Sequence, residues 1–186
     1  MDKLKLKQKF EAVIEELNPK WKSDPDMKDT PERLSNMYMH FFRNENVEHH
    51  LVKRFPSKNS QMVVVKNIEC FGMCPHHFAP IIYKVHVGYI PNGWVLGLSK
   101  LARIAIALSS YPKLQENFTT EIADVIEKNL KPRGVMVIVD GIHGCMRCRG
   151  VEQNANTITS DLRGAFKKDR VTTQEFIEYI KMDSHS

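Results

Sequence analysis

A segment with a two-residue period, 81–90, is the feature that most constrains the fold. Every second side chain in it is large and apolar: Ile81, Tyr83, Val85, Val87 and Tyr89. Because successive side chains of a strand point to opposite faces, this period predicts a strand with one buried face. The turn residues 91–93, Pro-Asn-Gly, end the strand.

The segments around this strand follow a defined order. Apolar, β-branched runs predict strands at 62–68, 135–139 and 156–162, and helical spacing of apolar residues predicts helices at 99–109, 114–130 and 173–180. From residue 62 the order is strand, strand, helix, helix, strand, strand. We therefore expect an α+β fold, a four-stranded antiparallel sheet with two helices on one face. Such a sheet leaves two open edges and an uncovered face, which favours an oligomer.

The first 60 residues carry helical rather than strand patterns. Apolar spacing predicts a helix over 3–18, and Thr30 and Pro31 are typical of an N-cap and a first helical position. We expect an N-terminal helical segment at 1–60 and one structural unit at 61–186. Within that unit Ser99 is the expected N-cap of the first helix.

Composition narrows the class of protein. Hydrophobic residues make up 42% and charged residues 26% of the 186 residues, which excludes a collagen-like, mucin-like or wholly disordered chain. No apolar run approaches the roughly 18 residues that span a bilayer, and residues 1–7 lack a secretory apolar core. We expect a cytoplasmic protein without a membrane partner. The net charge of +5 fits an anionic small molecule as well as a nucleic acid.

The cysteines and histidines suggest a metal site. Cys74 and His77 have C-x-x-H spacing, and Cys145 follows about 70 residues later. Thiolate and imidazole suit Zn²⁺ in tetrahedral geometry, and three protein ligands leave one position for water, as in catalytic zinc sites. A fourth ligand from Cys148 or Cys70 would instead make a structural site.

Two other interpretations of these residues are open at this point. Cysteine is common as a small buried apolar residue, so the group could belong to the core. The Cys145-x-x-Cys148 pair also fits a redox dithiol, although it lacks the usual setting between a strand and a helix.

Several motifs in one order resemble a known family, GTP cyclohydrolase I, a zinc enzyme of the tunnelling fold. The resemblance covers about residues 30–181. Its motifs are CPHH at 74–77, KVHVGY at 84–89, GLSKLAR at 97–103, QE at 115–116, HGCM at 143–146 and RGV at 149–151. Five or more motifs in register are far more specific than any one of them.

The resemblance implies an activity and a cofactor. The family converts GTP and water into 7,8-dihydroneopterin triphosphate and formate, the first step of pterin, folate or deazapurine synthesis. It implies that Cys74, His77 and Cys145 hold one zinc ion per subunit, and that His76 and His143 are catalytic. It also implies a homodecamer of two pentamers with active sites between subunits, and no nucleic-acid partner.

The resemblance further assigns the substrate contacts. Glu116 matches a guanine-binding glutamate, with Gln115 beside it, because a carboxylate can accept from both the N1–H and the 2-amino group of guanine. Ser99 matches a residue near the ribose and triphosphate, and the resemblance implies that it is catalytic together with His76 and His143. The remaining expected contacts, mainly to phosphate, are Leu98, Lys100, Arg103, Arg149 and, in a neighbouring subunit's site, Arg33.

Three positions depart from the family pattern. Pro75 replaces a common glutamate, Asn36 a frequent lysine, and Cys148 a usually apolar residue. Two other classes of function compete with the main one. A related tunnelling-fold nitrile reductase of deazaguanine synthesis would use a nucleophilic cysteine and a nicotinamide cofactor. A non-catalytic zinc-stapled module would bind nucleic acid and show a closed, four-ligand zinc.

Overall fold

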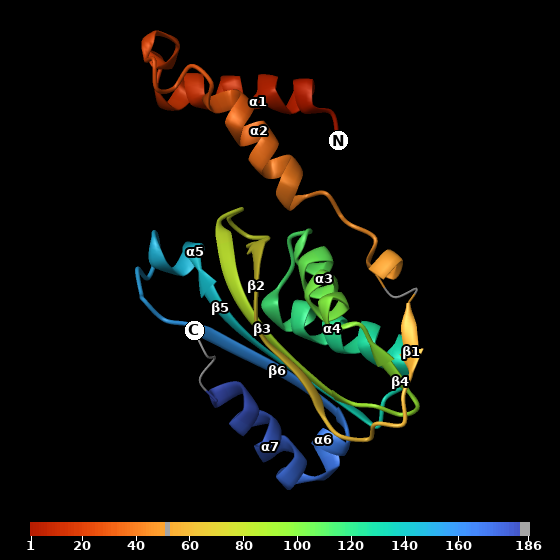
Figure 1. The fold of residues 1–186 in the computed structure, drawn as a ribbon. Coiled ribbons are helices and arrows are strands. Elements are labelled where there is room, and N and C mark those ends of the chain that lie inside the picture. The colour runs from red at the N-terminus through yellow and green to blue at the C-terminus, as the bar shows by residue number, and fades with distance from the viewer. Residues whose placement is uncertain (51–52, 183–186) are drawn as a thin grey trace. The chain divides into compact units, whose positions relative to one another are not determined.

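The computed structural model describes residues 1–50 and 53–182. The chain divides into two compact units, Met1–Arg43 and Asn44–Ser186, each described by itself below (Figure 1). The division falls earlier than the boundary expected at residue 60. Residues 183–186, the end of the unit expected at 61–186, lie outside the described residues.

The first unit is helical, as expected. It contains α1 (Lys3–Leu17), the 3₁₀ turn η1 (Trp21–Ser23) and α2 (Thr30–Phe41). The rings of Phe10 and Tyr38 join the two helices with their centroids 5.2 Å apart. Asp29, and not Thr30, occupies the N-cap of α2. Pro31 is tolerated one position later than expected, because backbone N–H groups of the first turn have no intrahelical acceptor.

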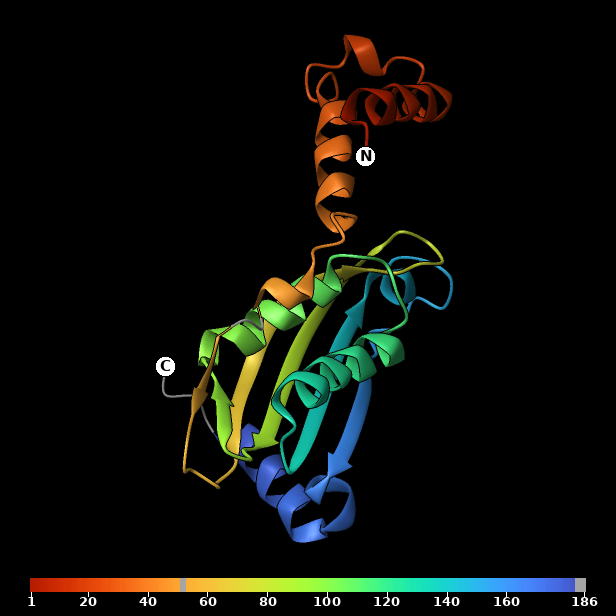
Figure 2. The ribbon, with the colours of Figure 1, turned by 90° about the vertical axis from the view of Figure 1, so that its right-hand side faces the viewer.

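The second unit is built on a four-stranded antiparallel sheet in the order β2-β3-β5-β6. Two helices lie between β3 and β5 in the chain and cover one face of the sheet (Figure 2). The bounds are β2 (Val63–Met73), β3 (Pro80–Ile90), α3 (Leu98–Ser109), α4 (Gln115–Leu130), β5 (Gly134–His143) and β6 (Thr157–Gly164). The predicted α+β tunnelling fold, with its two helices on one face, is confirmed.

Strand β2 runs five residues beyond its predicted end. The register with β3 shifts between Val65 and Ile68, and Asn67 has a positive φ of 58°. An irregularity of this kind adds a residue to one strand and shifts the faces that later side chains occupy. The apolar pattern is therefore interrupted where the prediction stopped, although the pairing continues to Met73.

The chain also contains short elements that the sequence did not predict. Strands β1 (Arg54–Pro56) and β4 (Trp94–Leu96) pair with each other, and the Arg54 guanidinium lies 4.7 Å from the Trp94 ring centre. Three-residue strands are too short to show a period. The others are η2 (Val47–His50), α5 (Gly144–Arg147) and α6 (Ala165–Lys168).

The main core lies between the sheet and the helices α3 and α4. The five alternating side chains of β3 are at most 2% exposed, which confirms the predicted buried face. They pack in one cluster with apolar side chains of the helices, among them Leu101, Ile104, Phe118, Ile122 and Ile126. None of the described helices is long and apolar enough to cross a membrane.

The opposite face of the sheet is partly covered, contrary to expectation. Figure 1 shows α7 (Arg170–Lys181) on the side of the sheet away from α3 and α4. Phe166 and Phe176 pack there with Met136 in a second buried cluster. The sequence predicted the C-terminal helix but not the face against which it packs.

Gly88 of β3 makes this packing possible, and a Gly88→Ala substitution should destabilise the fold. A Cβ at this position would lie 2.6 and 2.7 Å from two ring carbons of Phe176. Overpacking of this kind costs about 1–3 kcal/mol in free energy of unfolding. Urea denaturation at one protein concentration measures it, with Gly97→Ala as control, because its nearest neighbours would lie 3.8 Å away. Equal midpoints for the two variants would contradict the placement of Phe176.

Candidate active site

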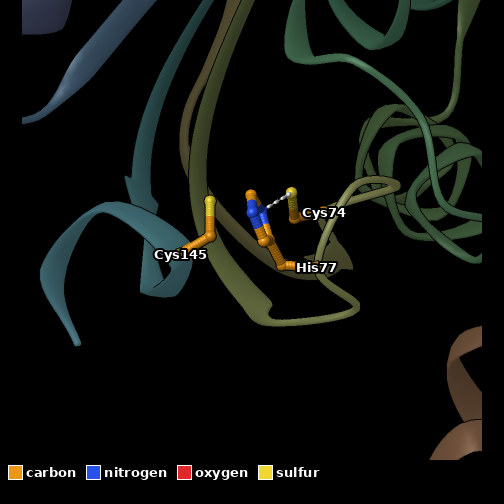
Figure 3. A group of neighbouring side chains, drawn as sticks. All are labelled: Cys74, His77 and Cys145. Carbon is orange, nitrogen blue, oxygen red and sulfur yellow. Dashed lines mark hydrogen bonds between the residues drawn. The ribbon is translucent and has the colours of Figure 1, made fainter. Parts of the chain in front are cut away.

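Three potential metal ligands meet where two strands of the sheet end. Cys74 and His77 lie in the turn between β2 and β3, and Cys145 lies on α5 directly after β5. The pairing of Ile81 with His143 brings these segments together. One ligand atom from each residue lies within 4.8 Å of the others, and Figure 3 shows His77 between the two cysteines.

The turn that carries Cys74 and His77 is fixed by its backbone. The N–H of Phe78 donates to the carbonyl of Cys74 at 3.0 Å, and the N–H of Cys74 donates to the carbonyl of Ala79 at 2.9 Å. Phe78 has a φ of 49°, in the left-handed region. This tight turn places residues three apart in the sequence on the same side.

The donor set fits a tetrahedral divalent metal ion. The Sγ of Cys74 and the Nδ1 of His77 are 3.8 Å apart. Zinc–sulfur and zinc–nitrogen bonds of about 2.3 and 2.1 Å give a donor separation of roughly 3.6 Å at a tetrahedral centre. Burial and the neighbouring Cys74 thiol raise the pKa of Cys145. A bound cation reverses that effect by stabilising the thiolate.

The other two cysteines are not part of this cluster in the described chain. The Cys148 thiol is exposed and donates to the carbonyl of Gly144 at 2.9 Å. Cys70 is 3% exposed in the main core, and burial raises its pKa to about 12. Cys70 is therefore a buried, unreactive thiol, as one of the sequence interpretations allowed.

A cavity of about 210 Å³ adjoins the cluster. Besides Cys74 and Cys145, its walls include four predicted site residues: His76, Gln115, Glu116 and His143. Glu116 lies in the first turn of α4, and His143 ends β5. Burial lowers the pKa of His143, although the nearby charge of Glu116 opposes this.

Gln115 also borders this cavity, but its side chain is directed into the protein. It is 3% exposed, and its Oε1 lies 2.7 Å from Nε2 of His143. Its amide nitrogen contacts β5 and β6. Two further residues of this network, Thr119 and Thr159, were missed by the sequence analysis, because a threonine on a helix or strand carries no functional signature.

The predicted phosphate contacts fall in three places. Arg149 adjoins the metal cluster, where its Nη1 lies 2.6 Å from Nε2 of His77. Arg33 lies on α2 in the first unit, with its Nη2 3.7 Å from Asp29. The third group is at the start of α3 and is not among the described residues that line the cavity; it consists of Leu98, Ser99, Lys100 and Arg103.

Ser99 is not the N-cap of α3, contrary to prediction. Gly97 holds that position with φ −60° and ψ 135°, and α3 begins at Leu98. The helix therefore starts two residues earlier than a capping serine at position 99 would place it. The exposed Ser99 side chain lies within the first turn, where backbone N–H groups favour anions.

A family model for GTP cyclohydrolase I matches residues 6–181 of this chain. The chain belongs to the GTP cyclohydrolase I family. The match begins well before residue 30, where the sequence resemblance began, so the family pattern includes the N-terminal helices.

Curated relatives agree with this membership. GTP cyclohydrolase 1 of Aquifex aeolicus is 42% identical over 185 residues, covering 97% of this chain and 98% of that protein. The enzymes of Desulforamulus reducens and Bacillus subtilis are 43% and 41% identical, covering 92% and 94% of this chain and 96% of each relative. The archaeosine synthase QueF-Like in its apo form aligns at 18% identity and a TM-score of 0.44, covering 56% of this chain and 96% of that one.

Membership of the GTP cyclohydrolase I family confirms the predicted enzyme class. GTP is the substrate that the family implies, and the Cys74, His77 and Cys145 group can hold a metal ion.

Proposed function

We propose that this GTP cyclohydrolase I family member uses one zinc ion per subunit to convert GTP and water into 7,8-dihydroneopterin triphosphate and formate. The observation that carries the proposal is a three-ligand cluster beside a cavity that also holds two histidines and a glutamate. Three protein ligands leave a coordination position for a reactant, as in catalytic zinc sites. We place the reaction at the start of pterin, folate or deazapurine synthesis, in the cytoplasm.

The two histidines move protons in this scheme. When bound, zinc supplies Lewis acidity, which makes water a nucleophile at neutral pH. Opening the imidazole ring of guanine requires a proton on the ring nitrogen next to C8. His143 is the first proton carrier, because an imidazole that borders the cavity can take a proton from the attacking water and pass it to that nitrogen. His76 is the second, with its Nδ1 4.0 Å from Sγ of Cys74.

Glu116 is the proposed guanine-binding residue, and a Glu116→Ala variant tests it. The carboxylate is exposed in the cavity wall, where it can accept from N1–H and the 2-amino group. Hydrogen bonds to a charged group contribute about 1.5–3 kcal/mol each. We expect KM for GTP to rise by roughly 100-fold or more while zinc content stays unchanged.

The matched control for this experiment is Glu178→Ala, an exposed glutamate on α7. Its KM should equal that of the unmodified enzyme. If Glu116→Ala binds GTP as tightly as the control does, the guanine assignment is wrong.

The triphosphate site is proposed to be completed between subunits. Leu98, Ser99, Lys100 and Arg103 lie at the start of α3, away from the cavity walls, and Arg33 belongs to the other unit. Strands β2 and β6 are the edges of the sheet, and open edges favour pairing with another chain. We therefore infer a homo-oligomer, a decamer of two pentamers. Light scattering that shows a stable, active monomer would overturn this part of the proposal.

The decisive test of the reaction is incubation of zinc-loaded protein with GTP, with formate and a dihydroneopterin-type product measured together. Equal amounts of the two products are expected. Formate without the pterin would mean that the reaction stops after ring opening. The absence of both products would refute the proposed function.

A further inference from the structure

Both N–H groups of the Gln115 carboxamide are engaged inside the protein, and its oxygen contacts His143. Its Nε2 lies 3.0 Å from the carbonyl of Val139, 2.8 Å from the carbonyl of Thr157 and 3.1 Å from Oγ1 of Thr159. Its Oε1 lies 2.7 Å from Nε2 of His143. The residue is 3% exposed. Its side chain therefore has no free N–H to offer to guanine beside Glu116.

These partners determine which way round the carboxamide lies. Backbone carbonyls only accept hydrogen bonds, so the group facing Val139 and Thr157 must be the NH₂. The opposite orientation would place Oε1 against two carbonyl oxygens in a buried site, which is strongly unfavourable.

A closed ring of hydrogen bonds supports the same orientation. It joins the backbone carbonyl and side-chain amide of Gln115 through the hydroxyl groups of Thr119 and Thr159. Oγ1 of Thr119 donates its single hydrogen to the carbonyl of Gln115 at 2.8 Å. It must therefore accept from Oγ1 of Thr159, which is 2.6 Å away. The hydrogen of Thr159 is then used, so Thr159 accepts from Nε2 of Gln115. Both hydroxyl hydrogens are thereby assigned, and the two hydrogens on Nε2 of Gln115 are shared among three acceptors, the carbonyls of Val139 and Thr157 and Oγ1 of Thr159.

The proton on His143 follows from this orientation. Oε1 of Gln115 can only accept, so Nε2 of His143 must donate. In a neutral imidazole the other nitrogen, Nδ1, is then unprotonated. We propose that Gln115 is a positioning residue that holds His143 in the tautomer with its hydrogen on Nε2, leaving Nδ1 to accept a proton during the reaction. This inference rests on the catalytic role of His143 in the proposed function.

Gly141 provides the space in which this contact forms. A Cβ on Gly141 would lie 2.1 Å from Oε1 of Gln115 and 3.1 Å from Nε2 of His143. The backbone of Gly141 does not have a positive φ, so alanine fits the strand itself. Gly141→Ala should therefore displace the flexible end of Gln115 while removing no polar group from the site.

The test compares Gln115→Met and Gly141→Ala with the unmodified zinc-loaded enzyme. ¹⁵N spectra of the histidine rings report which nitrogen carries the hydrogen, and loss of a signal in His143→Asn assigns it. The unmodified enzyme should show His143 protonated on Nε2, and both variants a mixture of tautomers. The kcat should fall about 10- to 100-fold, as for loss of a hydrogen bond that orients a site residue. Zinc content and KM for GTP should change less than about twofold.

A second pair of variants keeps the test decisive if Gln115→Met does not fold. Thr159→Val removes the hydroxyl that accepts from Gln115, and Thr159→Ser retains it. The valine variant should lower kcat and mix the tautomers, and the serine variant should do neither.

Several results would overturn the inference. One is an Nδ1-protonated His143 in the unmodified enzyme. A second is the unmodified tautomer and kcat in Gly141→Ala. A third is a raised KM with unchanged kcat in Gln115→Met, which would make Gln115 a substrate-binding residue. A fully active His143→Ala variant would instead refute the proposed role of His143, whatever the spectra of the Gln115 variants show.

Discussion

A Cys145→Ser variant is expected to lose bound zinc and GTP turnover together. Cys145 is one of three ligands whose donor atoms lie within 4.8 Å of one another. A serine hydroxyl does not ionise near neutral pH and cannot replace the thiolate. Loss of the several kcal/mol that a metal contributes to the transition state corresponds to at least about a 10³-fold fall in product formation. Metal analysis and the formate assay measure the two losses.

Cys148→Ser is the matched control, with the same change of sulfur to oxygen three residues later. Its thiol contacts the carbonyl of Gly144 and lies outside the three-ligand cluster. We expect one zinc ion per subunit and near-normal turnover. If Cys148→Ser lost zinc as completely as Cys145→Ser, the site would have four protein ligands and a structural role.

A His143→Ala variant should retain zinc but form product 10²- to 10⁴-fold more slowly, the range typical for loss of a general acid or base. The imidazole lies at the end of β5, borders the cavity and is held by Gln115. Because it is not a ligand in the cluster, metal content separates its loss from a damaged zinc site. Formate and pterin should be measured in the same reaction, since the two can fall by different factors.

His49→Ala is the control for this substitution, because His49 is exposed on η2 and distant in sequence from every site residue. It should be indistinguishable from the unmodified enzyme. Near-normal formate release by His143→Ala would rule out the proposed proton transfer.

The fold was predictable where a period extends over enough residues. The alternation in β3 and the helical spacing in α3 and α4 are long and regular, so the order and type of the main elements were identified correctly. The end of β2 was missed because the irregularity at Asn67 shifts the pattern. Strands β1 and β4 are held by pairing and by the Arg54–Trp94 contact, neither of which has a sequence signature.

The candidate site was predictable only where the residue types of a motif are typical of one kind of chemistry, such as metal binding. Cys74, His77 and Cys145 were grouped from residue type and resemblance, and the structure brings them together. The start of α3 was also expected at the site, but its residues are not among the described ones that line the cavity. A residue can contribute to the active site of its own chain or to that of a neighbouring subunit. Which of the two applies depends on how the subunits associate, and no local sequence pattern indicates this.

The function of Gln115 illustrates a further limit. The resemblance placed it beside Glu116 as a substrate contact, because adjacent residues share a motif. On a helix, however, adjacent side chains point about 100° apart. Both residues border the cavity, but Glu116 is exposed there, while the amide nitrogen of the buried Gln115 contacts β5 and β6.

Thr157 and Thr159 lie on β6, so how firmly Gln115 and His143 are held depends on whether this strand is paired with another chain. Both residues hold the Gln115 amide, and β6 is an edge strand of the isolated sheet. An edge strand paired on one side frays more easily than one paired on both. For the proposed homo-oligomer, dilution below the concentration at which copies would associate should therefore loosen His143 before the subunit unfolds. Specific activity would then fall with dilution while helix content, measured by circular dichroism, stays constant.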